Sequence, residues 1–240
     1  MQPLITPLLY PILVAFIWGI LVILVKDTKV PAIYGLGVSL TGGVFFMFLP
    51  AVIINVPVFA IFAEPAIMVN MAIIGITRYI LGTCLFYMSV KTGDLTIATP
   101  IVGLKIIIVT FISVALGLER LNFLLMAAIL LATAGFMTIT FHVRKLDNLN
   151  RWRTIKCIAF ALAAALCWSA GDILVLRVKH MNPFSITFVS LLLSWLLYLI
   201  FIISSRKQVF LLRMPSLDRK RYLLHGMFSL ALAYFILNLS

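Results

Sequence analysis

Residues 95–118 read LTIATPIVGLKIIIVTFISVALGL, an apolar run of 24 residues with a single charge, Lys105, near its middle. A helix needs about 20 apolar residues to cross the hydrocarbon core of a bilayer. The run is therefore long enough to cross, and only a helix would satisfy all its backbone N–H and C=O groups there. The stretch predicts a transmembrane helix that carries a lysine at mid-depth.

The rest of the chain is as apolar as this run. Of its 240 residues 64% are hydrophobic and 11% charged, and the mean hydropathy of +1.19 excludes a soluble globular domain. No Lys or Arg precedes Lys26 and no small-residue cleavage site follows the first run, so that run is not a secretory signal. The predicted fold class is all-α, a polytopic transmembrane helix bundle of about eight spans. We expect these spans over 8–25, 32–55, 67–90, 95–118, 122–142, 155–176, 184–203 and 222–239.

The basic residues favour one side of the membrane. Of the 19 Lys and Arg residues, about fourteen fall in the connections after the first, third, fifth and seventh predicted spans. The positive-inside rule places these loops in the cytoplasm and both termini outside. We therefore expect a multi-pass protein of the cell (plasma) membrane with cytoplasmic basic loops. Anionic lipid headgroups explain the loops without nucleic acid as a partner.

Two pairs of short, similar segments indicate an internal repeat. Residues 15–18 (AFIW) resemble residues 165–168 (ALCW) at an offset of about 150, and residues 78–82 resemble 221–226 at an offset near 143. If helices one to five correspond to the helices from the sixth onward, the repeat unit has five helices. Because five is an odd number, the second repeat then crosses the membrane in the opposite orientation to the first. The alternative is a chance likeness between apolar helices.

A longer match carries a family resemblance. Residues 86–100 read FYMSVKTGDLTIATP, and they are followed by a helix ending in Glu119-Arg120 and by a helix containing Gly135. Together with Trp18-Gly19 early in the first span, these motifs resemble the EamA-type repeat of the drug/metabolite transporter superfamily. The match runs over residues 8–142 as a full repeat and over 154–240 as a partial one.

The resemblance implies a secondary transporter, a permease or exporter, that moves a small organic metabolite across the membrane by alternating access. It divides the chain into a first five-helix repeat (1–142), a basic cytoplasmic linker (143–153) and a partial second repeat of three helices (154–240). The last two helices of the usual ten are then missing, and a homodimer would supply them. The charge pattern also places the N-terminus outside, whereas family members commonly start inside. The alternative function is a truncated or partner-dependent membrane protein without transport activity of its own.

Charges inside the spans mark the candidate substrate-binding site, because each costs about 2.5–3.5 kcal/mol at a helix centre. Three residues qualify: Lys105, Arg78 and Asp172. Trp18 and Trp168 join them because they lie inside spans and correspond in the repeat. Two cations and one acid favour an anionic or zwitterionic solute. The alternatives are a structural Arg78–Asp172 pair and tryptophans packed in the core.

The helical wheel makes a more detailed prediction for Lys105. At about 100° per residue it shares a face with Ile108, Ile112 and Leu116, while Thr110 lies opposite. A mid-depth lysine disfavours a lipid-facing side, so we expect this face to point into a pocket.

Motifs of other chemistries are absent from the sequence. It has no HExxH, GxSxG or P-loop, and its three histidines fall at predicted helix ends. The three cysteines lie inside apolar runs without metal-ligand spacing. We therefore expect no enzyme activity, no metal and no cofactor.

Overall fold

The computed structural model describes residues 6–53, 55, 61–62, 64–117, 123, 126–127, 129–131, 133–134, 151–205 and 213–239. All regular structure in these residues is helical, which confirms the predicted all-α class. Two long helices each contain a π-helical segment, labelled η. In chain order the elements are α1 (Thr6–Lys26), α2 (Ala32–Ile53), α4 (Pro65–Ile74), η1 (Gly75–Gly82), α5 (Thr83–Thr92), α6 (Leu95–Gly103), α7 (Lys105–Ala115), α9 (Arg151–Arg177), α10 (Pro183–Ser204), α12 (Ser216–His225), η3 (Gly226–Ala233) and α13 (Tyr234–Leu239).

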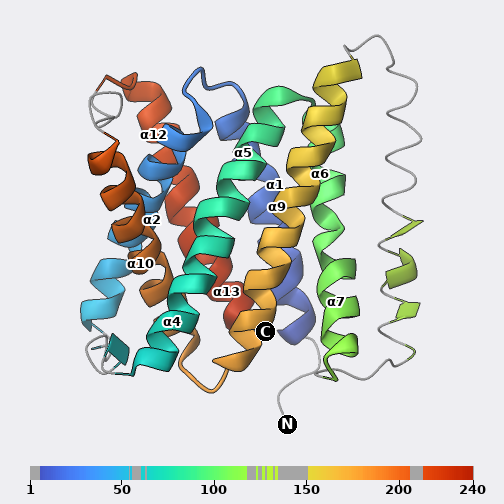
Figure 1. Ribbon diagram of the computed structural model, residues 1–240, viewed down its shortest axis with the longest axis vertical. Helices are drawn as coiled ribbons and strands as arrows, with labels where there is room; N and C mark the ends of the chain where they lie inside the picture. Colours follow the sequence, from blue (N-terminus) through green and yellow to red (C-terminus); the bar gives the residue numbers. More distant parts are fainter. Residues whose placement is uncertain are drawn as a thin grey trace.

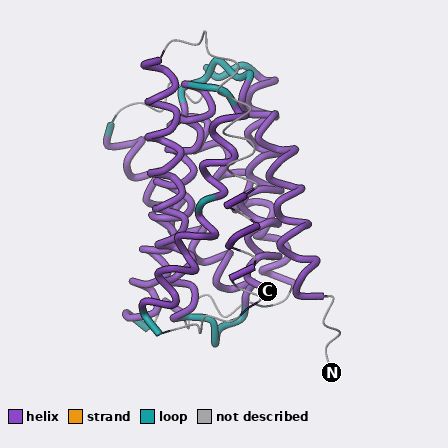
Figure 2. The backbone as a smooth tube through the Cα atoms, turned by 90° about the vertical axis from the view of Figure 1, so that its right-hand side faces the viewer, coloured by secondary structure: helices purple, strands orange, loops and turns teal. Residues whose placement is uncertain are grey.

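The helices form one bundle in which the long elements run side by side along a common direction (Figures 1 and 2). Five helices of the described residues are long and apolar enough to cross a membrane: Ala32–Ile53, Pro65–Thr92, Leu95–Ala115, Arg151–Arg177 and Pro183–Ser204. The protein is therefore a multi-pass membrane protein. The predicted count of eight spans and the inverted repeat stay predictions, and the expected span over 122–142 lies largely outside the described residues.

Local sequence signals set several helix starts. The carboxylate of Asp94 accepts a hydrogen bond from the Thr96 N–H at 3.2 Å, which caps α6. In the same way the Asn182 side chain accepts from the Phe184 N–H at 2.8 Å and caps α10. Proline follows Asn182 in the first turn of α10, where its missing N–H costs nothing.

The helix that carries Lys105 is interrupted just before this residue. Pro100 lacks an N–H, and the Leu104 N–H bonds the Ile101 carbonyl, three residues back, at 3.1 Å. This tighter turn changes the phase of α7 relative to α6. The wheel prediction is wrong beyond Lys105 itself: Thr110 is buried, whereas Ile112 and Leu116 are exposed. The side of α7 with Thr110 and Ser113 packs inward, and the long Lys105 side chain alone reaches Asp172 from the predicted face.

The element bounds repeat along the chain at a single spacing. Helices α2 and α10 both have 22 residues, and α4 and α12 both have 10 residues and continue into π segments of 8 residues. The second member of each pair begins 151 residues after the first. The similar segments 78–82 and 221–226, at an offset near 143, therefore do not correspond in the structure, because Arg78 lies within η1 whereas Arg221 lies in α12, before η3.

Each π segment begins with a glycine at a close helix crossing. A Cβ on Gly75 would lie 2.7 Å from the carbonyl oxygen of Ser190 on α10. A Cβ on Gly226 would lie 1.8 Å from the carbonyl oxygen of Ser39 on α2. Small residues thus allow backbones to approach, the usual means of helix association in membranes. The two crossings hold η1 against α10 and η3 against α2.

Candidate functional site

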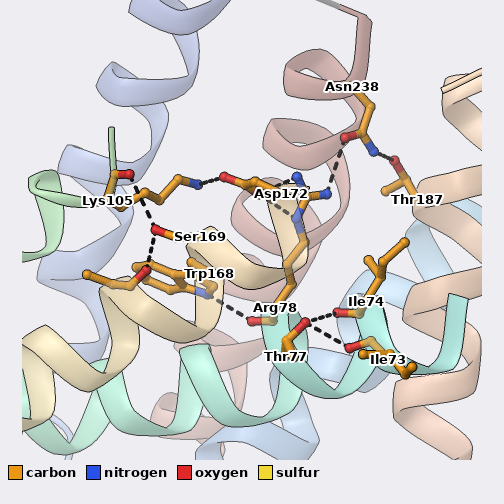
Figure 3. A network of polar contacts seen from close by, with 11 residues as sticks. Ile73, Ile74, Thr77, Arg78, Lys105, Trp168, Ser169, Asp172, Thr187 and Asn238 are labelled. Carbon is orange, nitrogen blue, oxygen red and sulfur yellow. Dashed lines mark hydrogen bonds and ion pairs between the residues drawn. The ribbon is translucent and has the colours of Figure 1, made fainter. Parts of the chain in front are cut away.

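Three charged side chains from three elements meet inside the bundle (Figure 3). Asp172 of α9 lies between Arg78 of η1 and Lys105 of α7. One carboxylate oxygen, Oδ1, accepts a hydrogen bond from Arg78 Nε at 2.6 Å and also pairs with Arg78 Nη2. The other, Oδ2, lies 2.7 Å from Lys105 Nζ. Only 2% of Arg78 and 8% of Lys105 are exposed, so this ion triad is a buried cluster with a net charge of one positive unit.

The backbone at Arg78 is held by donors from neighbouring residues. The indole Nε1 of Trp168 donates to the Arg78 carbonyl oxygen at 2.8 Å, and the Thr83 hydroxyl donates to the same oxygen at 3.2 Å. Arg78 lies within a π-helical segment, a feature found frequently at functional sites. These two bonds fix the position from which the guanidinium extends.

Close packing brings α9 against η1. A Cβ on Gly171 would lie 2.4 Å from Arg78 Cγ, and a Cβ on Gly82 would lie 2.3 Å from the Trp168 ring. The face of α9 that contains Trp168 is otherwise made of small residues: Ala161, Ala164 and Ala165 are fully buried. The sequence predicted this small-residue face with Asp172 on it, and the pairing of Asp172 with Arg78, left open there, is present.

Asn238 near the end of α13 is a second partner of Arg78. Arg78 Nη1 donates to Asn238 Oδ1 at 3.2 Å, and Asn238 Nδ2 donates to the Thr187 hydroxyl on α10 at 2.9 Å. The sequence analysis missed Asn238. The signal that could have found it is a lone amide within the apolar run 230–239.

Aromatic rings enclose the lysine of the triad. Lys105 Nζ lies 5.0 Å from the ring centroid of Trp18 and 5.9 Å from those of Trp168 and Tyr234. The two indoles are stacked with centroids 5.9 Å apart and planes at 16°. The guanidinium carbon of Arg78 lies 4.9 Å from the centroid of Tyr234. The structure thus brings together all five residues selected from the sequence and adds Tyr234, which the sequence analysis did not select.

A small cavity adjoins these rings. It has a volume of about 20 Å³, roughly the space of one water molecule. The Tyr234 hydroxyl is buried and has no hydrogen-bond partner among the described residues. The residues that line the cavity are Trp18, Thr83, Phe86, Trp168, His225, Ser229, Leu230 and Tyr234.

His225 is the third functional candidate that the sequence analysis missed. The predicted span began at residue 222 and left this histidine near a helix end, but the helix starts at Ser216 and His225 is only 3% exposed. Its Nδ1 lies 2.8 Å from the Tyr87 hydroxyl. Tyr222 and Gly226 lie one turn apart and are both buried, and His225 lies next to Gly226 on the same side of the helix. A helical wheel that began at residue 216 would therefore have placed His225 beside this buried face.

Comparisons with known proteins agree with this architecture. The sequence model of the EamA-like transporter family matches residues 5–141, more than half of the chain. A solved structure described only as "Crystal structure of protein" is similar with a TM-score of 0.66 and 16% sequence identity; the match covers 96% of this chain and 77% of that chain. This likeness shows a shared fold. No protein of curated function matches the sequence significantly.

Proposed function

We propose that this chain, which belongs to the EamA-like transporter family of the drug/metabolite transporter superfamily, carries a small organic anion or zwitterion across the membrane by alternating access. Members of that family are membrane transporters rather than enzymes. The proposed binding residues are Lys105, Arg78, Asp172, Trp18 and Trp168. The observation that carries the proposal is the net positive charge of the ion triad, whose two cations are almost fully buried in the bundle.

The charge of the triad supports an anionic ligand. Asp172 balances only one of the two cations, and an unbalanced charge in a medium of low dielectric is costly. A carboxylate or phosphate group on the solute would balance the second cation. Arg78 and Lys105 suit this role because guanidinium and ammonium groups form short, charge-assisted hydrogen bonds with such anions.

The aromatic rings extend the range of solutes to zwitterions. Trp18, Trp168 and Tyr234 surround a cation, Lys105 Nζ, at distances typical of cation–π contacts. An ammonium group of a solute would make cation–π contacts with the same rings and would lie close to the Asp172 carboxylate. A zwitterion would then place its anionic end on the two basic side chains and its cationic end on Asp172.

The position of the triad suits a transporter that exposes one site to either side in turn. The three side chains come from η1, α7 and α9, so a relative movement of these helices would open or close the site. We place this cycle in the plasma membrane with the basic loops in the cytoplasm, as the charge pattern predicts.

A thermal-shift panel on purified protein tests the proposal. Anionic, zwitterionic, neutral and cationic metabolites are added in turn, since a ligand that binds only the folded state stabilises it by mass action. We expect anions or zwitterions to raise the melting temperature, and we expect Lys105→Ala to abolish that shift. Lys179→Ala, which removes an exposed lysine, should retain it. An equal shift in Lys105→Ala would contradict the assignment of the site.

Flux measurements separate transport from binding alone. Proteoliposomes should accumulate a radiolabelled solute that gives a thermal shift, and Arg78→Ala should reduce the uptake at least tenfold. An absence of flux for every such solute, at any lipid composition, would favour the partner-dependent alternative. Chemical crosslinking in the same vesicles would then show whether a second copy of this chain is that partner.

A further inference from the structure

A second polar cluster borders the small cavity through His225. It consists of Ser39 on α2, Tyr87 on α5, and Tyr222 and His225 on α12, and we call it the histidine cluster. The Ser39 hydroxyl lies 2.8 Å from the Tyr87 hydroxyl, which lies 2.8 Å from His225 Nδ1. Ser39 also donates a hydrogen bond to the Tyr222 carbonyl oxygen at 3.0 Å. All four residues are buried.

The number of hydrogens in this chain of bonds fixes the form of the neutral histidine. Ser39 has one hydroxyl hydrogen and donates it to the Tyr222 carbonyl, so Tyr87 must be the donor to Ser39. Tyr87 has then used its own hydrogen, so Nδ1 of His225 must carry a hydrogen and donate it to Tyr87. The neutral ring therefore leaves Nε2 with a free lone pair, and Nε2 has no hydrogen-bond partner among the described residues.

Hydrogen bonds connect the histidine cluster with the turn between α1 and α2. The Tyr222 hydroxyl lies 2.8 Å from the Thr28 hydroxyl in the turn after α1. Lys91 Nζ, which is only half-buried, donates to that hydroxyl at 2.9 Å and to the carbonyl oxygens of Thr28 and Val30. Polar groups thus extend from the α1–α2 turn to His225.

On its other side His225 borders the substrate site. It lines the cavity together with Trp18, Trp168 and Tyr234, the three rings around Lys105 Nζ. His225 and the ion triad thus border the same three aromatic rings.

The groups that border His225 itself offer no carboxylate within the described residues. The titratable groups that face it or its partners are the phenols of Tyr87, Tyr222 and Tyr234, the thiol of Cys84 and, on the Tyr222 side, the carboxylate of Asp218. Elements α1, α2 and α9 present the uncharged side chains of Trp18, Ser39 and Trp168. The nearest charges are Lys91 and Asp218 on the Tyr222 side and, behind the rings, the triad. No ion pair joins His225 to an acid within the described residues.

We propose that His225 is a proton-binding site coupled to the anion site, so that one proton is carried with each anion. In this step Nε2 accepts a proton from the aqueous phase, and nothing is oxidised or reduced. Without a solute, a protonated His225 would face a triad that is already net positive, and the two would repel each other across a medium of low dielectric. A bound anion cancels the charge of the triad and removes that repulsion.

The sign of the pH effect follows from linkage. If the anion raises the proton affinity of His225, a proton on His225 must raise the anion affinity by the same factor. Anion binding should therefore tighten as the pH falls through the range in which histidine takes up a proton. This inference rests on the proposed anion site.

Calorimetry with benzoate, which stays ionised from about pH 5.5 to about pH 8, tests the coupling. We expect full-length protein to bind benzoate about tenfold more tightly at the lower pH, within the usual range of coupling factors. In His225→Gln that ratio should fall to within about twofold of unity, whereas His180→Gln, at an exposed histidine, should keep it. A ratio that persists in His225→Gln, or equal affinities in the unmodified protein, overturns the coupling and leaves the proposed function intact. No benzoate binding at either pH counts against the anion site and so overturns both.

A second measurement needs no anion. NMR of protein labelled with ¹⁵N at its histidines distinguishes a ring protonated at Nδ1 from one protonated at Nε2, and His225→Gln identifies the signal of His225. We expect the Nδ1–H form at about pH 8. Ser39→Ala frees the Tyr87 hydroxyl to donate to His225 and should shift the ring toward the Nε2–H form. An Nε2–H ring in the unmodified protein overturns the assignment of the free nitrogen.

Discussion

Asp172→Ala is expected to destabilise the protein by about 3–5 kcal/mol, the cost of breaking a buried ion pair by removing one partner. The carboxylate binds Arg78 through Oδ1 and Lys105 through Oδ2, and both cations are almost fully buried. Without Asp172 two positive charges would remain in the bundle with no acid between them. For a chain of this length the loss corresponds to a fall in melting temperature of about 10 °C or more. Thermal unfolding in detergent, followed by circular dichroism, measures it.

Two further variants make this result specific to the ion triad. Asp27→Ala removes an exposed acid in the turn after α1 and should melt within about 2 °C of the unmodified protein. Adding Lys105→Met to Asp172→Ala removes one of the two unbalanced cations and should recover part of the loss. A melting temperature of Asp172→Ala close to that of Asp27→Ala would contradict a buried, mutually dependent triad.

Gly226→Ala is expected to lower the free energy of unfolding by about 3 kcal/mol or more, at the upper end of the usual cost of overpacking. The added Cβ would lie 1.8 Å from the Ser39 carbonyl oxygen, and backbone atoms cannot move aside as a flexible side chain can. The helices α2 and η3 would have to separate, and this would pull Ser39 away from Tyr87. We therefore also expect a loss of the pH dependence of benzoate binding.

Gly19→Ala is the matched control for this substitution. Gly19 lies within α1, and apart from the adjacent backbone of α1 no atom of the described residues lies within 4 Å of the position of its Cβ. Since alanine favours a helix more than glycine does, Gly19→Ala should leave the melting temperature unchanged or raise it slightly. Equal effects of the two substitutions would show that the α2–η3 crossing is looser than the structure has it.

The helices themselves could be predicted from the sequence. The predicted segments 32–55, 95–118 and 184–203 correspond to Ala32–Ile53, Leu95–Ala115 and Pro183–Ser204. This works because a run of about 20 apolar residues has one stable solution in a bilayer, whatever surrounds it. The extra turns of α12 before residue 222 were missed because they are polar: Ser216–His225 contains Asp218 and three consecutive basic residues.

The residues of the ion triad could also be selected from the sequence. A charge inside an apolar span is costly enough to need a partner or a function, and this holds before the partner is known. Tyr234, Asn238 and His225 carry a smaller penalty as neutral side chains, so their local sequence marks them far less strongly than a charge does. They matter only through what the other helices place beside them.

The sequence by itself determined the all-helical membrane class, most span positions and the charged residues that must lie within the bundle, because length, hydropathy and charge act locally. The tertiary structure decided which of these residues meet. The turn at Leu104 and the π segments η1 and η3 change the phase of their helices, and at about 100° per residue a small change of phase turns a side chain to a different neighbour. Lys105 therefore reaches Asp172, and the bond from Ser39 to the Tyr222 carbonyl fixes the tautomer of His225, through contacts between residues far apart in the chain.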